Sequence, residues 1–334
     1  MERAVLILIL FVLLLNGRHP EFRPPSWSAN VKVSATPLAL FPDQPERRQL
    51  GELTYIGGWA LHSGKVRFGS ISSMTVDGTG RVTALSDGGE VMVFRPGPKH
   101  FRAHVYPVAI FPAEEHGPQW RWDTESMAVD PASGRIWVGF EAVMRICRYS
   151  MAFARVEQCA SPPAAREWPM RTGMESLVRL PDGRFLAIAE DSPGPKGGHD
   201  VLLFAGDPVD PATPPPARLS YMAPAGYLPT DAIAIGGGRM LVMNRRLTLA
   251  DMFTGVLTMV DIRDLRPGAV LKSREVARLA SPVPHDNFEA LAMSHENGRP
   301  VLWIASDDNG LFFQRTLVLK FAMPPDWFRP VAAH

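Results

Sequence analysis

The chain has 334 residues, of which 46% are hydrophobic and 21% are charged, a composition that excludes disordered and fibrous proteins. Lys plus Arg total 35 and Asp plus Glu total 34, so the formal net charge is +1. That balance argues against a protein that coats nucleic acid, because such proteins carry a basic excess, and no nucleic-acid partner is expected.

The first predicted element is an uninterrupted apolar run from Val5 to Leu15. It is shorter than the roughly 20 residues that a membrane-spanning helix needs, and it suits the apolar region of a secretory signal. No small-x-small cleavage site follows Leu15 directly. Residues 1–16 are therefore expected to be a signal peptide or an uncleaved signal anchor. The protein is expected to be exported, either periplasmic or attached to the inner membrane by this segment alone.

Residues 17–49 are rich in Pro and Arg and show no convincing period, which predicts a linker. Periodic sequence follows from residue 50 to 323, and residues 324–334 form a C-terminal tail. The two cysteines, Cys147 and Cys159, lie on what read as two arms of a hairpin that turns near Phe153. Cross-strand cysteines in an exported protein form a disulfide or stay as two buried thiols, and both readings remain open.

One segment recurs five times within residues 50–323, as a strand, a turn containing Gly-Arg and a second strand. The glycines of the turns are at positions 80, 134, 183, 238 and 298. Each copy predicts a β-hairpin, and a period near 50 residues with several strands per unit indicates a β-propeller. A parallel α/β fold is disfavoured, because no amphipathic helix of normal length lies between the strands.

Further strand-like sequence lies at both ends of the repeat region, in residues 53–61 and 316–321. A blade shared between the two termini would use both segments and would pair edges that are otherwise exposed. The predicted fold is therefore all-β, a single six-bladed β-propeller whose last blade is closed by N- and C-terminal strands.

Acidic residues recur at the open end of these hairpins. In an antiparallel hairpin the first residue of one strand lies opposite the last residue of the other, and these positions are acidic in most copies. If the first strand of each hairpin is the inner strand of its blade, the carboxylates converge on one mouth of the central channel. The predicted acidic ring consists of Asp87, Glu125, Glu141, Glu175, Glu190, Asp231, Glu289 and Asp307. Ser72 and Asn244 depart from the pattern, since they stand where other copies have a carboxylate.

Crowded carboxylates destabilise a ladder and raise one another's pKa, so a cation that neutralises them is expected. Several oxygen ligands around a wide ring suit calcium, and no Cys/His cluster of zinc spacing is present. All eight acidic residues are candidate metal ligands. The alternative is that strand-end carboxylates accept hydrogen bonds from turn amides or pair with Arg, and that their recurrence is inherited symmetry.

Five segments carry a resemblance to a known family: FGSISSM (68–74), LSD (85–87), GMESL (173–177), RFLAIAE (184–190) and DNFEALA (286–292). They resemble the "esterase-like activity of phytase" family of bacterial exported proteins, over roughly residues 50–323. The resemblance implies a phytase-like propeller with functional Glu and Asp residues. The resemblance does not itself imply a reaction. The expected function is a metal-assisted hydrolase that acts on a small-molecule substrate, a phosphoester or another ester.

The predicted mechanism uses bound calcium to neutralise a phosphoester and to position a water. Glu175 and Glu289 are the candidate catalytic carboxylates, one of them as general base. Arg245 or Arg246 would clamp phosphate oxygens, or would instead form salt bridges with the acidic mouth. A serine esterase is not supported, because no Gly-x-Ser-x-Gly elbow occurs. Two alternatives stay open: a non-catalytic propeller that binds a ligand or protein at the envelope, and a lactonase-like calcium-dependent hydrolase.

Overall fold

The computed structural model describes residues 28–64, 68–108, 123–169 and 172–329. The regular secondary structure of these residues consists of strands and short 3-10 helices. Most of the strands form five antiparallel units of four strands, which we call blades 1 to 5. Blade 1 contains β4 (Ile71–Val76), β5 (Val82–Ser86), β6 (Glu90–Phe94) and β7 (His100–Pro107). Blade 2 contains β8 (Thr124–Val129), β9 (Ile136–Phe140), β10 (Arg145–Tyr149) and β11 (Val156–Ala160).

The remaining blades follow in chain order. Blade 3 contains β12 (Met174–Arg179), β13 (Phe185–Pro193), β14 (His199–Phe204) and β15 (Ala217–Met222). Blade 4 contains β16 (Leu228–Gly236), β17 (Arg239–Thr248), β18 (Met252–Asp261) and β19 (Val270–Leu279). Blade 5 contains β20 (Asn287–Glu296), β21 (Arg299–Asp307), β22 (Thr316–Ala322) and the N-terminal β3 (Leu53–His62).

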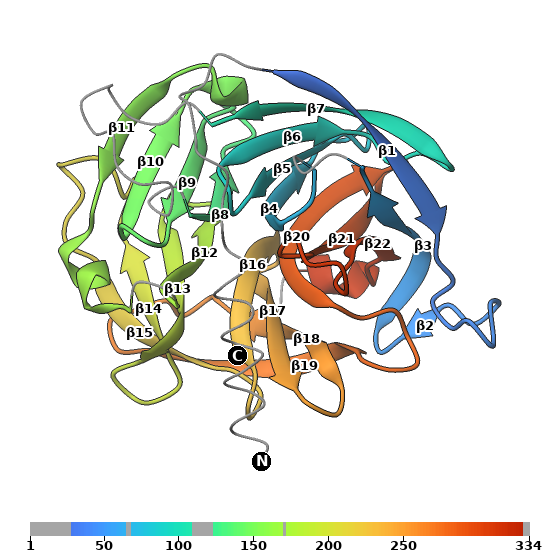
Figure 1. Cartoon of the computed structure of the whole chain (residues 1–334). Coiled ribbons are helices and arrows are strands. Elements are labelled where there is room, and N and C mark those ends of the chain that lie inside the picture. Colours follow the sequence, from blue (N-terminus) through green and yellow to red (C-terminus); the bar gives the residue numbers. More distant parts are fainter. Residues whose placement is uncertain (1–27, 65–67, 109–122, 170–171, 330–334) are drawn as a thin grey trace.

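The first strands of the five blades pack side by side in a closed ring around the centre of the molecule (Figure 1). The ring runs β4, β8, β12, β16 and β20, and β20 packs back against β4. The first strand of each recurring hairpin is thus the inner strand of its blade. Each hairpin turns through the recurring glycine, whose φ is positive in all five copies. The φ values run from 70° at Gly134 to 88° at Gly183.

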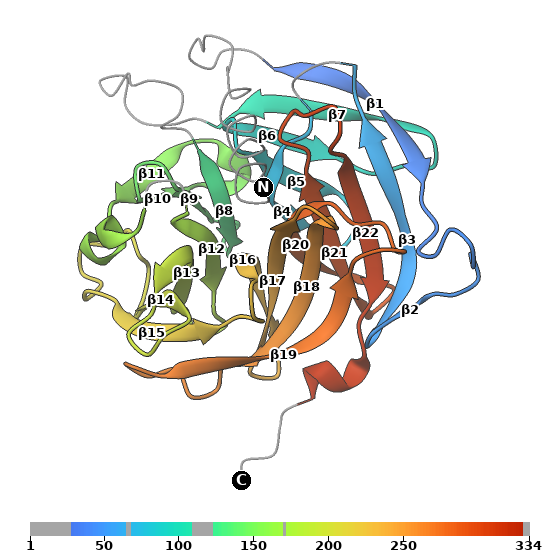
Figure 2. The same cartoon turned by 60° about the horizontal axis from the view of Figure 1, so that its bottom comes forward.

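Strands from the two ends of the chain complete one blade, as the sequence predicts. The C-terminal β22 pairs antiparallel with the N-terminal β3, for example Val318 with Trp59 (Figure 2). However, the two strands complete the fifth blade, and a sixth blade is not confirmed among the described residues. The five hairpins already supply every inner strand of the closed ring, so the terminal strands have only outer positions left to fill.

The domain boundary drawn at residue 50 lies inside the folded part. Ala29–Pro37 belongs to the predicted linker, yet it forms strand β1 between β3 and β7. Val31 and Val33 are buried, while Asn30 and Lys32 are exposed, which is the alternation expected of a strand with one buried face. The predicted tail also packs, since Trp327 of the 3-10 helix Pro325–Phe328 is buried and donates a hydrogen bond of 3.1 Å to Glu52.

The predicted signal segment, residues 1–16, lies outside the described residues. Within the described ranges, no helix has the length and apolar character needed to cross a membrane. Cys147 and Cys159 are register partners on β10 and β11 and form a disulfide, so this reading of the two cysteines is confirmed.

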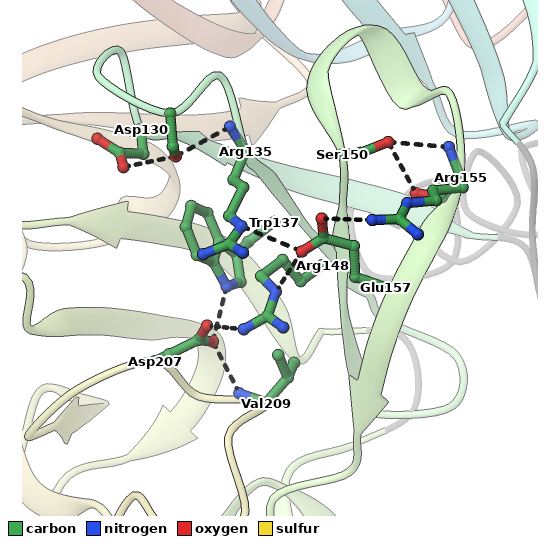
Figure 3. A network of polar contacts seen from close by, with 10 residues as sticks. Asp130, Arg135, Trp137, Arg148, Ser150, Arg155, Glu157, Asp207 and Val209 are labelled. Atoms are coloured by element: carbon green, nitrogen blue, oxygen red, sulfur yellow. Dashed lines mark hydrogen bonds and ion pairs between the residues drawn. The ribbon is translucent and has the colours of Figure 1, made fainter.

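The blades are held together by apolar side chains between the sheets and by polar contacts. Some of these polar contacts lie at the end of the blades opposite the predicted acidic ring. Met243 of blade 4 and Leu291 of blade 5 belong to one buried cluster. Between blades 2 and 3, Asp207 accepts a hydrogen bond of 2.7 Å from the Trp137 indole and pairs with Arg148, as Figure 3 shows. This network ties the loop after β14 to the neighbouring sheet.

Candidate metal centre at the channel mouth

Each inner hairpin contains a β-bulge near the start of its first strand. The extra residue has no direct partner on the second strand, and a bulge of this kind re-aims a side chain. The bulged residues are Ser72, Glu125, Glu175, Thr230 and Glu289. Three of the five are glutamates, so the bulges place carboxylates where the inner strands begin.

A second set of equivalent positions lies on the facing strand, directly after the partner of the residue that precedes the bulge. In blade 3 that pair is Met174 with Ala189, so the position is Glu190, and in blade 4 the pair is Pro229 with Asn244, so the position is Arg245. The five equivalents are Asp87, Glu141, Glu190, Arg245 and Asp307. Arg245, rather than Asn244, therefore stands in blade 4 where the other blades have a carboxylate.

Asp231 does not join the other predicted ligands, because the bulge of blade 4 falls one residue earlier, at Thr230. Its carboxylate is buried and accepts hydrogen bonds from the backbone N–H groups of Ala232 at 2.8 Å and Leu291 at 2.7 Å. Burial raises its pKa well above the ordinary value, and these two N–H groups oppose the shift. Asp231 thus links the inner strands of blades 4 and 5.

A candidate cation site lies at blade 2, where Asp123, Glu125 and Glu141 each offer one carboxylate oxygen within 4.8 Å of the other two. Glu125 and Glu141 are predicted ligands, but Asp123 was missed. Asp123 stands two residues before the bulged Glu125, at a position that is Ser70, Gly173, Leu228 or Asn287 in the other repeats. No recurrence therefore marks Asp123 in the sequence.

Burial and mutual repulsion raise the pKa values of two carboxyls in this group. The pKa of Glu125 is raised well above its ordinary value by burial and then by Asp123, Glu175 and Glu141. Burial and the Asp123 charge raise the pKa of Glu141 to about 8, although Gly173 donates a backbone hydrogen bond of 2.8 Å to it. Asp123 and Glu125 are only partly buried, so the group remains open to solvent.

Carboxylates from blades 1 and 5 face one another beside this group. Burial raises the pKa of Asp87 to about 8, with further contributions from Asp123 and Glu289. The pKa of Asp307 is raised well above its ordinary value by burial, Glu289 and Asp87. Seven of the eight predicted ligands thus interact with at least one other carboxylate of the set or with Arg245, and Asp231 is the exception.

Arg245 crosses the channel mouth between blades 3 and 5. Its guanidinium donates hydrogen bonds to Glu190 at 2.8 Å and to Asn287 at 2.6 Å, and it pairs with Glu289. Burial opposes its charge, but the carboxylates of Glu289, Glu190 and Glu175 outweigh burial and raise the pKa of Arg245 further. Arg245 therefore neutralises part of the negative charge that Glu190 of blade 3 and Glu289 of blade 5 bring to the mouth.

Arg246 points elsewhere, because neighbouring strand residues face opposite sides of a sheet. Its guanidinium stacks over the Tyr227 ring at 4.7 Å, and its Nε is buried without a hydrogen-bond partner in the described part of the chain. Among the described residues, it forms no ion pair with the channel carboxylates. Of the two predicted arginines, only Arg245 reaches the acidic mouth.

The donor set of the Asp123 group fits a hard divalent cation. Its three ligands are carboxylates, it includes neither sulfur nor nitrogen, and Glu125 and Glu141 hold protons more tightly than free glutamates do. Calcium and magnesium bind such oxygen ligands. A cation that displaced those protons would offset the burial and the repulsion that raise both pKa values.

Comparison with known proteins gives weak structural likenesses and one family. Glutaminyl cyclase of Myxococcus xanthus has 10% identity and a TM-score of 0.45, and the match covers 81% of this chain and 97% of that one. An endo-arabinase of Bacteroides thetaiotaomicron has 9% identity and a TM-score of 0.47, with 80% and 96% covered. Likenesses this low say nothing about activity. No curated protein matches the chain.

The family model described as "Phytase-like: Esterase-like activity of phytase" matches residues 66–310. That range contains all five recurring hairpins and every carboxylate of the channel mouth. The chain belongs to the phytase-like family, whose description is esterase-like activity of phytase.

Proposed function

We propose that the protein is an exported, metal-assisted hydrolase that acts on phosphoesters or other esters at the acidic channel mouth. The observation that carries the proposal is the group of Asp123, Glu125 and Glu141, whose ligand oxygens lie within 4.8 Å of one another. Three carboxylates in a partly open position would hold a divalent cation, and calcium is favoured because the ring offers several further oxygens. Family membership supports the hydrolase class.

Asp123, Glu125 and Glu141 would hold a divalent cation, which would supply Lewis acidity toward a phosphoryl or carbonyl group. Arg245 supplies the complementary positive charge across the mouth and orients an anionic substrate through its guanidinium fork. Glu289 and Asn287 hold that guanidinium in place. Arg246 has no place in this mechanism, because it stacks on Tyr227 instead.

Glu175 carries the proton transfer. It interacts electrostatically with Glu141 of the cation group and with Arg245, so it lies between the two charged parts of the site. Burial raises its pKa well above the ordinary value, Glu190 and Glu141 raise it further, and Arg245 opposes the shift. In its carboxylate form Glu175 would take a proton from a water and, as the acid so formed, return that proton to the leaving oxygen.

Neutral esters, lactones among them, are the second candidate class of substrate. The observation that favours them is that Arg245 already has two carboxylate partners, Glu190 and Glu289. The charge left for a phosphate is therefore smaller than that of a free guanidinium. A substrate without negative charge would not have to compete with these partners.

The test is calorimetric titration of calcium and of magnesium into the chelator-treated full chain, followed by a screen of phosphoesters and lactones. Glu125→Gln and Glu141→Gln should each weaken cation binding at least tenfold. Asp210→Asn is the matched control, since Asp210 is an exposed carboxylate in the loop after β14. Absence of binding at millimolar cation would refute the metal centre. Cation binding without turnover of any ester would leave an envelope binding protein as the better description.

Export is part of the same proposal and is supported by the disulfide between Cys147 and Cys159, since structural disulfides are typical of oxidising compartments. Fractionation of cells that express the full chain, with sequencing of the mature N-terminus, tests it. Recovery in the soluble periplasm would indicate cleavage after the apolar run. Recovery in the inner membrane would indicate an anchor, and recovery in the cytoplasm would refute export.

A further inference from the structure

Exposed apolar side chains gather on two loops at the channel mouth. The exposed large hydrophobic residues of the described chain are Ile56, Met151, Leu249, Met252, Phe312 and Phe313. Leu249 and Met252 lie where β17 turns into β18, a few residues after Arg245. Phe312 and Phe313 lie between β21 and β22, after Asp307. Phe312 is 98% exposed and Phe313 is 43% exposed, which is costly for aromatic rings without an occupant.

The two loops meet at a hollow of about 260 Å³. Met252, Phe253 and Phe313 form its apolar wall. The facing wall includes Asp286 and Arg315, whose side chains are paired at 3.2 Å. The hollow therefore combines an aromatic surface with fixed polar groups, which is the usual make-up of a small-molecule site.

Beside the hollow lies a buried polar group that has no partner among the described residues. Gln314 lines the hollow, and both the oxygen and the nitrogen of its side-chain amide are buried without a hydrogen-bond partner among the described residues. Leaving such a group unsatisfied costs free energy, and native structures rarely do so without a reason.

One residue of the hollow is the chain neighbour of a residue at the acidic mouth. Asp286 on its wall is followed in the chain by Asn287, whose side chain donates a hydrogen bond of 2.7 Å to Glu289. Asn287 also accepts a hydrogen bond from Arg245. A molecule with its reacting group beside Arg245 would reach Phe313 and Met252 by extending past Asn287 and Asp286.

We propose that this hollow binds the aryl group of an ester whose ester bond lies at the channel mouth. The inference rests on the proposed function and names its substrate class. The size of the hollow matches a single ring, and aromatic pairs and Met–aromatic contacts are favourable there. A protein partner would need an interface of about 1,000 Å² or more, far larger than this patch.

The experiment compares the dissociation constants of phenyl phosphate and methyl phosphate for the calcium-loaded full chain. The wild-type protein should bind phenyl phosphate about tenfold more tightly, because only that ligand buries a ring. Phe313→Ser and Met252→Ser should bring the two constants close together and leave that of methyl phosphate unchanged. Both side chains are partly exposed, so these variants should fold. Met151→Ser is the matched control, because Met151 is exposed beside the Gly134 turn of blade 2.

A second readout separates this inference from the proposed function. In protein labelled with carbon-13 at the methionine methyl groups, phenyl phosphate should shift the Met252 resonance, and methyl phosphate should not. If phenyl phosphate binds in a calcium-dependent way but neither moves Met252 nor responds to Phe313→Ser, the aryl site is refuted and the metal centre stands. If neither phosphate binds, benzyl alcohol is the probe. A saturable Met252 shift that Phe313→Ser abolishes would retain the aryl site without the function, and no shift would refute both.

Discussion

Glu190 of blade 3 and Arg245 of blade 4 occupy the same position of neighbouring hairpins, and a hydrogen bond of 2.8 Å joins their side chains. One repeat thus supplies a cation where its neighbours supply carboxylates. The same guanidinium pairs with Glu289 of blade 5. The ring is therefore asymmetric, with a carboxylate group open to a cation at blade 2 and a built-in cation at blade 4.

Replacing Arg245 should reveal how much the stability of the protein depends on this positive charge at the channel mouth. Arg245→Gln leaves Glu190 and Glu289 buried without their ion-pair partner, and breaking a buried pair in this way costs about 3 kcal/mol of unfolding free energy. Urea unfolding of the metal-free protein at pH 7 measures it. Arg315→Gln is the control, since it removes an ion pair whose arginine side chain is 51% exposed and should cost less.

The loss caused by Arg245→Gln should also depend on pH. Arg245 opposes the upward pKa shifts of Glu289 and Glu175, so its removal raises both pKa values further. A carboxyl whose folded pKa exceeds its unfolded pKa contributes stability that is lost as pH rises through the folded value. The variant should therefore lose less stability at pH 5 than at pH 7.5. Equal losses at the two pH values would contradict this electrostatic account.

Much of the architecture could be predicted from sequence, because the Gly-Arg turns repeat at spacings that only a blade-like unit explains. The blade count could not, since strand sequence at the termini does not reveal whether it forms its own blade or completes another. β1 was assigned to a linker because its alternation, from Val31 to Ala35, is short and lies in Pro- and Arg-rich surroundings.

The candidate site was less predictable, and the reason is the register of the bulges. The repeat aligns Asp231 with Glu175 and Asn244 with Glu190, but the bulge of blade 4 lies at Thr230, so that alignment fails there by one residue. A bulge depends on backbone geometry rather than on a residue pattern. The same limit explains Asp123, whose role comes from its distance to Glu125 and Glu141 and not from recurrence.

Metal-free protein should lose stability as pH rises. The folded-state pKa values of Asp87 and Glu141 are about 8, far above those of an unfolded chain, so the stability that they contribute is lost between about pH 4 and pH 8. Calcium should offset the loss by about 2.7 kcal/mol at a concentration of 100 times its dissociation constant. Thermal melts with chelator and with calcium at pH 5 and pH 8 measure this. A calcium effect that is larger at pH 5 would contradict the account.

Glu141→Gln should weaken the dependence of metal-free stability on pH. The variant removes one titrating carboxyl of the cation group, so its metal-free stability should change less between pH 5 and pH 8 than that of the wild type. It should also respond less to calcium, because a ligand is lost. Glu157→Gln is a suitable control, since Glu157 pairs with Arg148 at 2.9 Å in the network remote from the mouth.

Asp231→Ala should separate stability from cation binding. The substitution leaves the backbone N–H groups of Ala232 and Leu291 buried without their acceptor, at a cost of about 2 kcal/mol. Calcium affinity should stay within about twofold of the wild-type value, because Asp231 shares no electrostatic interaction with the other channel carboxylates. Calorimetry alongside urea unfolding measures both quantities. A tenfold loss of affinity would return Asp231 to the ligand set.

The interblade network of Figure 3 should matter for stability and not for the site. Asp207→Ala removes the acceptor of the Trp137 indole and the partner of Arg148, so about 2 kcal/mol of unfolding free energy should be lost. Asp210→Ala in the same loop changes an exposed residue and should cost less than 0.5 kcal/mol by the usual range for surface substitutions. Calcium binding should be unchanged in both variants. If Asp207→Ala weakened calcium binding in the folded protein, the contacts between blades 2 and 3 would have to set the spacing of the Asp123 group, and the two ends of the propeller would be coupled.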